Sequence, residues 1–192
     1  GTESFIPWSS SRLYAYNNNG SNAVIIRDTT GIINYVFGFS ENDAPNIRYL
    51  EFVSVTGLGS HEFENCSNLS YVSLPYVSRI ASHAFKNCTN LNYIYLPRWS
   101  SLDDTDYDIF YGCVNLQDVY LLSSDVVSLW RETFSSCPSN IQVHIPEELC
   151  EIYNYTYRSK SFQVNGGYKT ASELFDCMST EPIPQQGCLY VE

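Results

Sequence analysis

Apolar and polar positions recur along the middle of the chain with a period of 22 to 25 residues. The period is marked by four cysteines, Cys66, Cys88, Cys113 and Cys137, which lie 22, 25 and 24 residues apart. A phenylalanine stands three residues before each of them, at Phe63, Phe85, Phe110 and Phe134. Apolar pairs stand six and eight residues after them: Val72 and Leu74, Ile94 and Leu96, Val119 and Leu121, and Val143 and Ile145. Agreement at so many positions indicates an internal repeat.

Each repeat contains one short strand. The apolar pair alternates with polar or aromatic residues, so its two side chains point inward and their neighbours point outward. A proline ends the strand in three repeats, at Pro75, Pro97 and Pro146. One period earlier, Leu50 and Phe52 fit the same frame without its cysteine, which makes five rungs. A rung leaves its apolar face open unless a neighbour covers it, so the pattern predicts a solenoid of stacked rungs.

The clearest repeat is the sequence LSYVSLPYVSRIASHAFKNC, from Leu69 to Cys88. It resembles the BspA-type leucine-rich repeat of bacterial and protist surface proteins over residues 46–146. The resemblance implies a solenoid with short β-strands on the concave side and an irregular convex side. It also implies export, adhesion to host matrix proteins and no catalytic apparatus. Two rungs depart from the pattern: the third carries the insertion SSLDDTDYDIF, and the fourth has Leu122 and Thr133 in place of Pro and Ala.

The ends of the chain are predicted to be caps, because terminal rungs would otherwise expose core. Residues 1–45 form a β-rich N-terminal cap. In it, strands at 23–27 and 32–37 are joined by a hairpin, with a further strand at 12–16. Residues 147–192 form a helical C-terminal close and tail, in which a helix begins after Pro146 and a strand and glycine turn follow at 161–169. A capping box of Thr170 and Glu173 predicts a second helix through Met178.

Composition excludes several functions. Acidic residues outnumber basic ones by 21 to 10, for a net charge of −11, whereas binding to a nucleic-acid backbone needs a positive protein surface. No run of about 18 apolar residues occurs, so we expect no membrane insertion. The first residues lack the basic and apolar regions of a signal peptide. The export that the resemblance implies would use a signal that we expect to lie outside this sequence.

The seven cysteines leave at least one unpaired within the chain. The four repeat cysteines point the same way into a stacked column, and we expect them to be buried free thiols that behave as small apolar groups. Cys150, Cys177 and Cys188 lie in the C-terminal region. A Cys177–Cys188 disulfide is one pairing there, and the sequence alone leaves the pairing open.

Metal binding has two weak candidates. His61 and His83 share a register with Asp108 and Glu132, and these are ligand types of transition metals, although a solvated convex face explains them as well. Asp104, Asp106 and Asp108 match the start of a calcium-binding EF-hand loop. That loop needs Gly at its sixth position and Glu at its twelfth, where this chain has Ile109 and Asn115. We therefore expect no metal and no cofactor.

The concave strand face holds the predicted binding residues: Tyr49, Tyr71, Tyr93, Tyr95, Tyr120 and His144. Strand alternation turns them outward, and rung stacking places Tyr71 beside Tyr93, and Tyr95 beside Tyr120. Exposed clustered aromatic side chains with polar neighbours mark contact sites. The alternative is that tyrosines on neighbouring strands only stabilise the sheet.

No signature of nucleophilic catalysis or phosphate binding occurs in the chain, and we expect no enzyme activity. The sequence favours an extracellular or cell-surface module for binding and adhesion. Its expected ligand is a protein or a glycan, and host matrix proteins are among the protein candidates. The module would bind through the tyrosine-rich concave face. The alternative is a surface spacer that has no ligand of its own.

Overall fold

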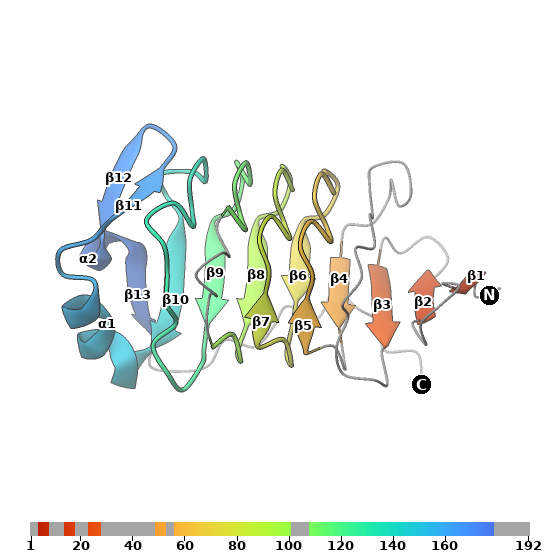
Figure 1. The fold of residues 1–192 in the computed structure, drawn as a ribbon, viewed down its shortest axis with the longest axis horizontal. Helices are drawn as coiled ribbons and strands as arrows, with labels where there is room; N and C mark the ends of the chain where they lie inside the picture. Colours follow the sequence, from red (N-terminus) through yellow and green to blue (C-terminus); the bar gives the residue numbers. More distant parts are fainter. Residues whose placement is uncertain are drawn as a thin grey trace.

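The computed structural model describes residues 4–7, 14–17, 23–27, 49–52, 56–100 and 108–178. In this part of the chain, nine strands form one sheet along the whole length of the molecule, in the order β1-β2-β3-β4-β6-β8-β9-β10-β13 (Figure 1). The strands are β1 Ser4–Pro7, β2 Tyr14–Asn17, β3 Ala23–Arg27, β4 Tyr49–Phe52, β6 Tyr71–Ser73, β8 Tyr93–Leu96, β9 Asp118–Leu121, β10 Gln142–Pro146 and β13 Phe175–Met178.

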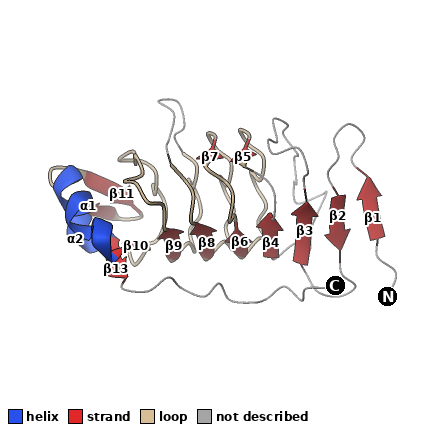
Figure 2. Ribbon diagram, turned by 90° about the horizontal axis from the view of Figure 1, so that it is seen from below, coloured by secondary structure: helices blue, strands red, loops and turns tan. Residues whose placement is uncertain are grey.

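Strands β4 to β10 pair in parallel with the register that the sequence predicts. Tyr71 pairs with Tyr93, and Tyr95 pairs with Tyr120. Two short strands, β5 (Gly57–Leu58) and β7 (Arg79–Ile80), pair in parallel on the opposite side of the solenoid (Figure 2). Each rung therefore crosses from the long sheet to this second side and returns, and the predicted solenoid is confirmed.

The core lies between these two sides. The predicted inward residues are all buried: Val72, Leu74, Ile94, Leu96, Val119, Leu121, Val143 and Ile145. The repeat phenylalanines are buried too and stack from rung to rung, with ring centroids 5.4 Å apart between Phe63 and Phe85 and about 6 Å apart further along. Burying a ring of this size contributes about 2–3 kcal/mol, so the column is a main source of stability.

The repeat cysteines form a second column. None of the four forms a disulfide, as predicted, and Cys88, Cys113 and Cys137 are buried. The thiols of Cys88 and Cys113 donate to the carbonyl oxygens of Phe63 and Phe85, one rung earlier, at 3.1 and 3.0 Å. Burial raises the pKa of Cys113 to about 12, so it stays a thiol and is a poor nucleophile. Cys66, in the first of these rungs, is only partly buried, and there the prediction is wrong.

The turns around these columns use left-handed backbone at two fixed places in the repeat. One lies five residues before the cysteine, at His61, His83 and Asp108, and the other lies directly before it, at Asn65, Asn87, Gly112 and Ser136. Asparagine and glycine tolerate this conformation better than other residues. At Gly112, with φ of +79°, a Cβ would also collide with Asn87. The turn chemistry thus follows the repeat, except that the fourth rung lacks the first left-handed position, at Glu132.

The N-terminal strands extend the sheet. β1 and β2 pair in antiparallel, as do β2 and β3, whereas β3 pairs in parallel with β4. The strands predicted at 12–16 and 23–27 correspond to β2 and β3. The predicted hairpin between 23–27 and 32–37 is wrong, because β2 and β4 occupy both edges of β3. Residues 32–37 lie outside the described part of the chain.

The C-terminal segment begins with a 3-10 turn, Glu147–Leu149, and continues into helix α1, Cys150–Thr156. A hairpin of β11 (Ser161–Val164) and β12 (Gly167–Thr170) follows. Next comes helix α2, which covers only Ala171–Leu174. The helix predicted through Met178 is wrong beyond Leu174. The open edge of β10 offers unpaired backbone groups, and Phe175–Met178 satisfies them as β13.

Side chains from the C-terminal segment also complete the last rung. The hydroxyls of Tyr153 and Tyr157 accept hydrogen bonds from the backbone N–H groups of Val127 and Leu129, at 3.0 and 2.8 Å. Tyr157 in turn donates to the carbonyl oxygen of Val127, and Lys160 donates to that of Leu129. A next rung would supply backbone partners here. At the end of the array, tyrosine hydroxyls and a lysine take their place.

A disulfide joins Cys150 of α1 to Cys177 of β13, with Cα atoms 5.7 Å apart. The suggested Cys177–Cys188 pairing is therefore wrong, because Cys177 already has a partner. Sequence spacing gave no reason to prefer Cys150. The structure selects it because α1 packs beside β13 at the end of the sheet (Figure 1).

Candidate functional site

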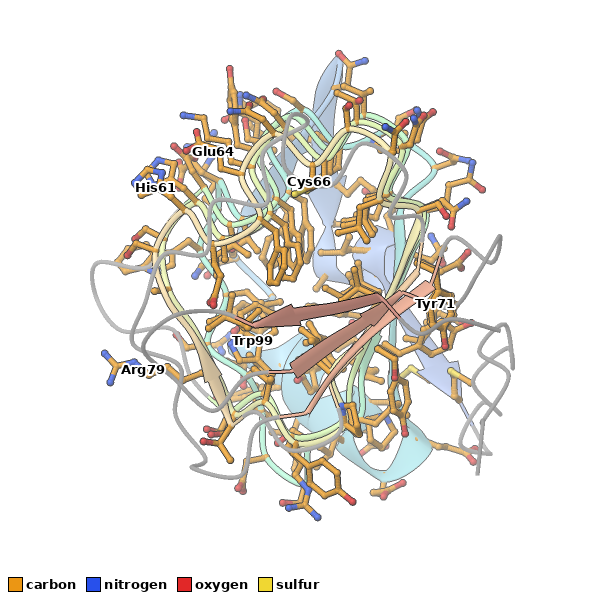
Figure 3. The ribbon with its side chains drawn as sticks, turned by 90° about the vertical axis from the view of Figure 1, so that its right-hand side faces the viewer. His61, Glu64, Cys66, Tyr71, Arg79 and Trp99 are labelled. Carbon is orange, nitrogen blue, oxygen red and sulfur yellow. A yellow bond between two sulfur atoms is a disulfide. The ribbon has the colours of Figure 1, made fainter. Side chains whose placement is uncertain are left out.

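The outward side of the long sheet, here called the strand face, holds the side chains that alternate with the core residues. In β6 to β13 it consists of Tyr71, Tyr93, Tyr95, Tyr120 and His144 with Ser73, Asp118, Gln142 and Asp176. Figure 3 looks along the solenoid and shows Tyr71 on the sheet side, Trp99 inside and Arg79 on the opposite side. Tyr49 pairs with Tyr71 through the backbone, and its side chain lies outside the described residues.

Four aromatic rings form a continuous stack on this face, here called the aromatic row. Ring centroids lie 4.6 Å apart between Tyr71 and Tyr93, 4.9 Å between Tyr93 and Tyr120, and 4.3 Å between Tyr120 and His144. The predicted neighbours Tyr71 and Tyr93 are in contact. The contact of Tyr93 with Tyr120 was not predicted, because the two residues occupy different positions in their strands. It forms because the position opposite Tyr93 is Asp118, which leaves the Tyr93 ring free to pack on Tyr120.

The tyrosine side chains of the strand face are more buried than the sequence predicted. Tyr71 and Tyr95 are each only 8% exposed, so the expectation of exposed aromatic side chains is wrong for these two. Tyr93 has a neighbouring ring on each side, and so does Tyr120. Burial, followed by the nearby Tyr71 and Tyr120, raises the pKa of Tyr93 well above its usual range. The aromatic row therefore presents ring edges rather than open ring faces, and the hydroxyl oxygen of Tyr93 is itself buried.

His144 ends the aromatic row between two carboxylates. Its Nε2 lies 2.8 Å from Oδ1 of Asp118, and its Nδ1 lies 2.7 Å from Oδ2 of Asp176. An ionised carboxylate only accepts hydrogen bonds, so the ring nitrogen that carries a proton is the donor in each contact. Asp176 comes from β13, so His144 joins the closing strand to β9. The sequence prediction missed Asp176 because a helix was expected there. The alternation of Phe175, Asp176 and Cys177 was the available signal.

The row of possible metal ligands lies on the other side of the molecule. His61 and His83 stack with ring centroids 4.6 Å apart, and His61 Nδ1 lies 2.6 Å from Glu64 Oε2. The contact from His83 Nε2 to Asp108 is longer, at 3.9 Å. Within the described ranges no three His, Cys, Asp or Glu side chains are arranged to hold an ion. Asp104 and Asp106 lie outside those ranges, so the EF-hand resemblance stays untested.

Glu62 is a buried charged group that the sequence prediction missed. It is fully buried, and its Oε2 accepts a 2.7 Å hydrogen bond from Gly59 N–H. Burial raises the pKa of Glu62 to about 8, partly offset by that hydrogen bond. The position corresponds to Ala84 in the next rung, so the repeat alignment already gave a signal: a carboxyl group at an apolar position. It lies among core residues, away from the strand face.

Comparison with known proteins gives a family match. The family model described as "BspA type Leucine rich repeat region" matches residues 10–118 and 56–165, with six copies. The match begins at residue 10, within the segment predicted as an N-terminal cap. No curated protein sequence matches the chain significantly.

A crystal structure of a leucine rich cell surface protein from Faecalibacterium prausnitzii is similar at 19% sequence identity, with a TM-score of 0.46. The similarity covers 70% of this chain and 32% of that one. In the described part of this chain, no helix combines the length and apolar character that crossing a bilayer requires.

Proposed function

This chain belongs to the family of BspA-type leucine-rich repeats, and from that premise we propose that it is a non-enzymatic binding and adhesion module. Its binding surface is the strand face, with Tyr49, Tyr71, Tyr93, Tyr95, Tyr120 and His144 as the contact residues. The observation that carries the proposal is the aromatic row, which spans four rungs on an outward sheet surface. Clustered tyrosines beside polar groups are typical of contact surfaces.

The covered ring faces favour a protein ligand over a glycan. Sugars pack best on an open aromatic face, whereas Tyr93 and Tyr120 have neighbours on both sides. Ring edges and hydroxyl groups suit the mixed apolar and polar surface of a protein. Host matrix proteins, which the family resemblance suggests, remain the first class to test.

We place the protein outside the cell or on its surface. The Cys150–Cys177 disulfide supports this, because disulfides persist in oxidising compartments and are rare in the cytosol. We also propose that residues 1–45 and 147–192 cap an array at 46–146. Support for the C-terminal cap comes from the tyrosine hydroxyls that complete the last rung.

The test is a screen of protein and glycan arrays with the whole chain, followed by Tyr93→Ala and Tyr95→Ala. Each variant should weaken binding by about 1 kcal/mol, or about fivefold. Tyr93→Phe and Tyr95→Phe keep the rings and separate loss of a hydroxyl from loss of packing. Tyr168→Ala, at an exposed tyrosine of β12, is the matched control and should bind as the wild type does. A ligand that binds every variant equally would exclude the strand face as its site.

The second candidate function is a surface spacer without a ligand. The low exposure of Tyr71 favours it, because its ring packs on that of Tyr93 and stabilises the sheet without any partner. The same arrays separate the two functions: the spacer predicts no specific ligand for the wild-type chain.

A further inference from the structure

Between β6 and β13, the part of the strand face whose side chains are described, the charges are of one sign. Its outward positions in β6 to β13 include two aspartates, Asp118 and Asp176, and no lysine or arginine. The whole chain carries a net charge of −11. Building on the proposed binding function, we propose that the partner is a basic, extended protein segment whose lysine or arginine side chains lie against Asp118 and Asp176.

The two carboxylates are available to such a partner. His144 holds Oδ1 of Asp118 and Oδ2 of Asp176, yet these side chains are 42% and 50% exposed. One imidazole ring can carry at most one positive charge, so two carboxylates around it keep a net negative charge. A lysine or arginine of the partner would neutralise it and donate to the solvent-facing side of the carboxylates.

The neighbouring Tyr120 lies in the negative potential of these two carboxylates. The pKa of Tyr120 is raised first by burial and then by the charges of Asp118 and Asp176. Both carboxylates therefore act on the Tyr120 hydroxyl, in the middle of the face. A negative group brought there would be repelled, and a cation would be attracted.

Hydrogen-bonding chemistry points the same way. Ionised carboxylates only accept hydrogen bonds, whereas lysine and arginine side chains only donate them. The face extends over the five neighbouring strands β6, β8, β9, β10 and β13, or about 19 Å at the usual strand spacing. This length is greater than one side chain or small cation can use. An extended polypeptide is the occupant that matches both the length and the charge.

The experiment uses the whole chain and a fluorescent ten-residue oligolysine peptide at physiological salt, with oligoglutamine and oligoglutamate peptides of equal length beside it. Only oligolysine should bind. Asp118→Asn with Asp176→Asn should weaken its binding at least tenfold. The matched control, Asp125→Asn with Glu132→Gln, removes two charges from exposed positions elsewhere and should change binding less than twofold. Asp118→Glu with Asp176→Glu keeps the charge and should retain binding, which separates charge from structural damage.

Four outcomes would overturn the proposal. First, if Asp125→Asn with Glu132→Gln weakens oligolysine binding as much as Asp118→Asn with Asp176→Asn does, the attraction is a diffuse one to an acidic protein. Second, if spermine binds more tightly than oligolysine, the site is one for small cations. The third outcome is a glycan or a neutral protein from the arrays that loses affinity with Tyr93→Ala and is unaffected by the aspartate variants. In that case the basic partner would be wrong and the proposed function would stand. If neither the tyrosine nor the aspartate variants change binding of any ligand found, both are wrong.

Discussion

The repeat array and the C-terminal segment solve the same problem in different ways. Every rung has backbone groups and apolar side chains that need a neighbour. Within the array the next rung supplies both, as in the stacked phenylalanines and the parallel strands. At residues 147–178 no repeat continues, and individual side chains take over: two tyrosine hydroxyls, a lysine and a disulfide. The contacts inside the array therefore repeat from rung to rung, whereas the contacts at its end use residues that do not repeat.

The comparison predicts that loss of a core ring damages the array most. Phe85→Ala should lower the free energy of unfolding by about 3–5 kcal/mol, because Phe85 is fully buried between Phe63 and Phe110. Chemical denaturation followed by circular dichroism measures it. Ile152→Ala, at a half-exposed position of α1, is the control and should cost less than 1 kcal/mol. A small effect of Phe85→Ala would mean that the rungs do not depend on the phenylalanine column.

Loss of the Cys150–Cys177 disulfide should destabilise the C-terminal segment and leave the repeat array unchanged. Cys150→Ser with Cys177→Ser removes a link between residues 27 positions apart, which should cost about 2–4 kcal/mol. Hydrogen exchange should speed up in α1 and β13 while β6 and β8 keep their protection. Cys66→Ser, at a partly buried thiol outside the disulfide, is the control for the substitution itself. Uniform loss of protection along the chain would show that array and end unfold as one unit.

Glu62 should make the first rungs sensitive to pH. The pKa of Glu62 is raised from 4.5 to about 8, so the folded protein binds a proton that the unfolded chain releases between these values. Stability should therefore fall as the pH rises from about 4.5 to about 8. Glu62→Gln has no proton to lose at this position and should lose less stability than the wild type between pH 4.5 and pH 8.

Thermal unfolding across that pH range tests this prediction. Glu132→Gln, at an exposed position, is the control for loss of one negative charge. The stability difference between Glu62→Gln and the wild type should shrink toward pH 4. A constant difference at all pH values would contradict the proton linkage.

The smallest expected effect comes from single hydroxyl groups. Tyr157→Phe removes a hydroxyl that accepts from Leu129 N–H and donates to the carbonyl oxygen of Val127. The N–H of Leu129 and the carbonyl oxygen of Val127 then stay buried without this hydroxyl. The free energy of unfolding should fall by about 1–3 kcal/mol. Tyr155→Phe, at a mostly exposed tyrosine two residues earlier, should cost almost nothing. Equal effects in the two variants would mean that the tyrosine hydroxyls do not complete the last rung.

The sequence alone determined the rung, its register and its core. Cys88, Phe85, Ile94 and Leu96 lie where the repeat predicts, because strand alternation and the period leave one inward-facing set of side chains. The same alternation placed Tyr71 beside Tyr93 on the outward side.

The tertiary structure decided the contacts that depend on neighbours far away in sequence. Phe175–Met178 is a strand because the edge of β10 is open, against a local capping box that favours a helix. Cys177 bonds Cys150, and Asp176 reaches His144, as consequences of that pairing. Local sequence sets what a segment can form, and an unsatisfied backbone edge elsewhere in the fold sets what it does form.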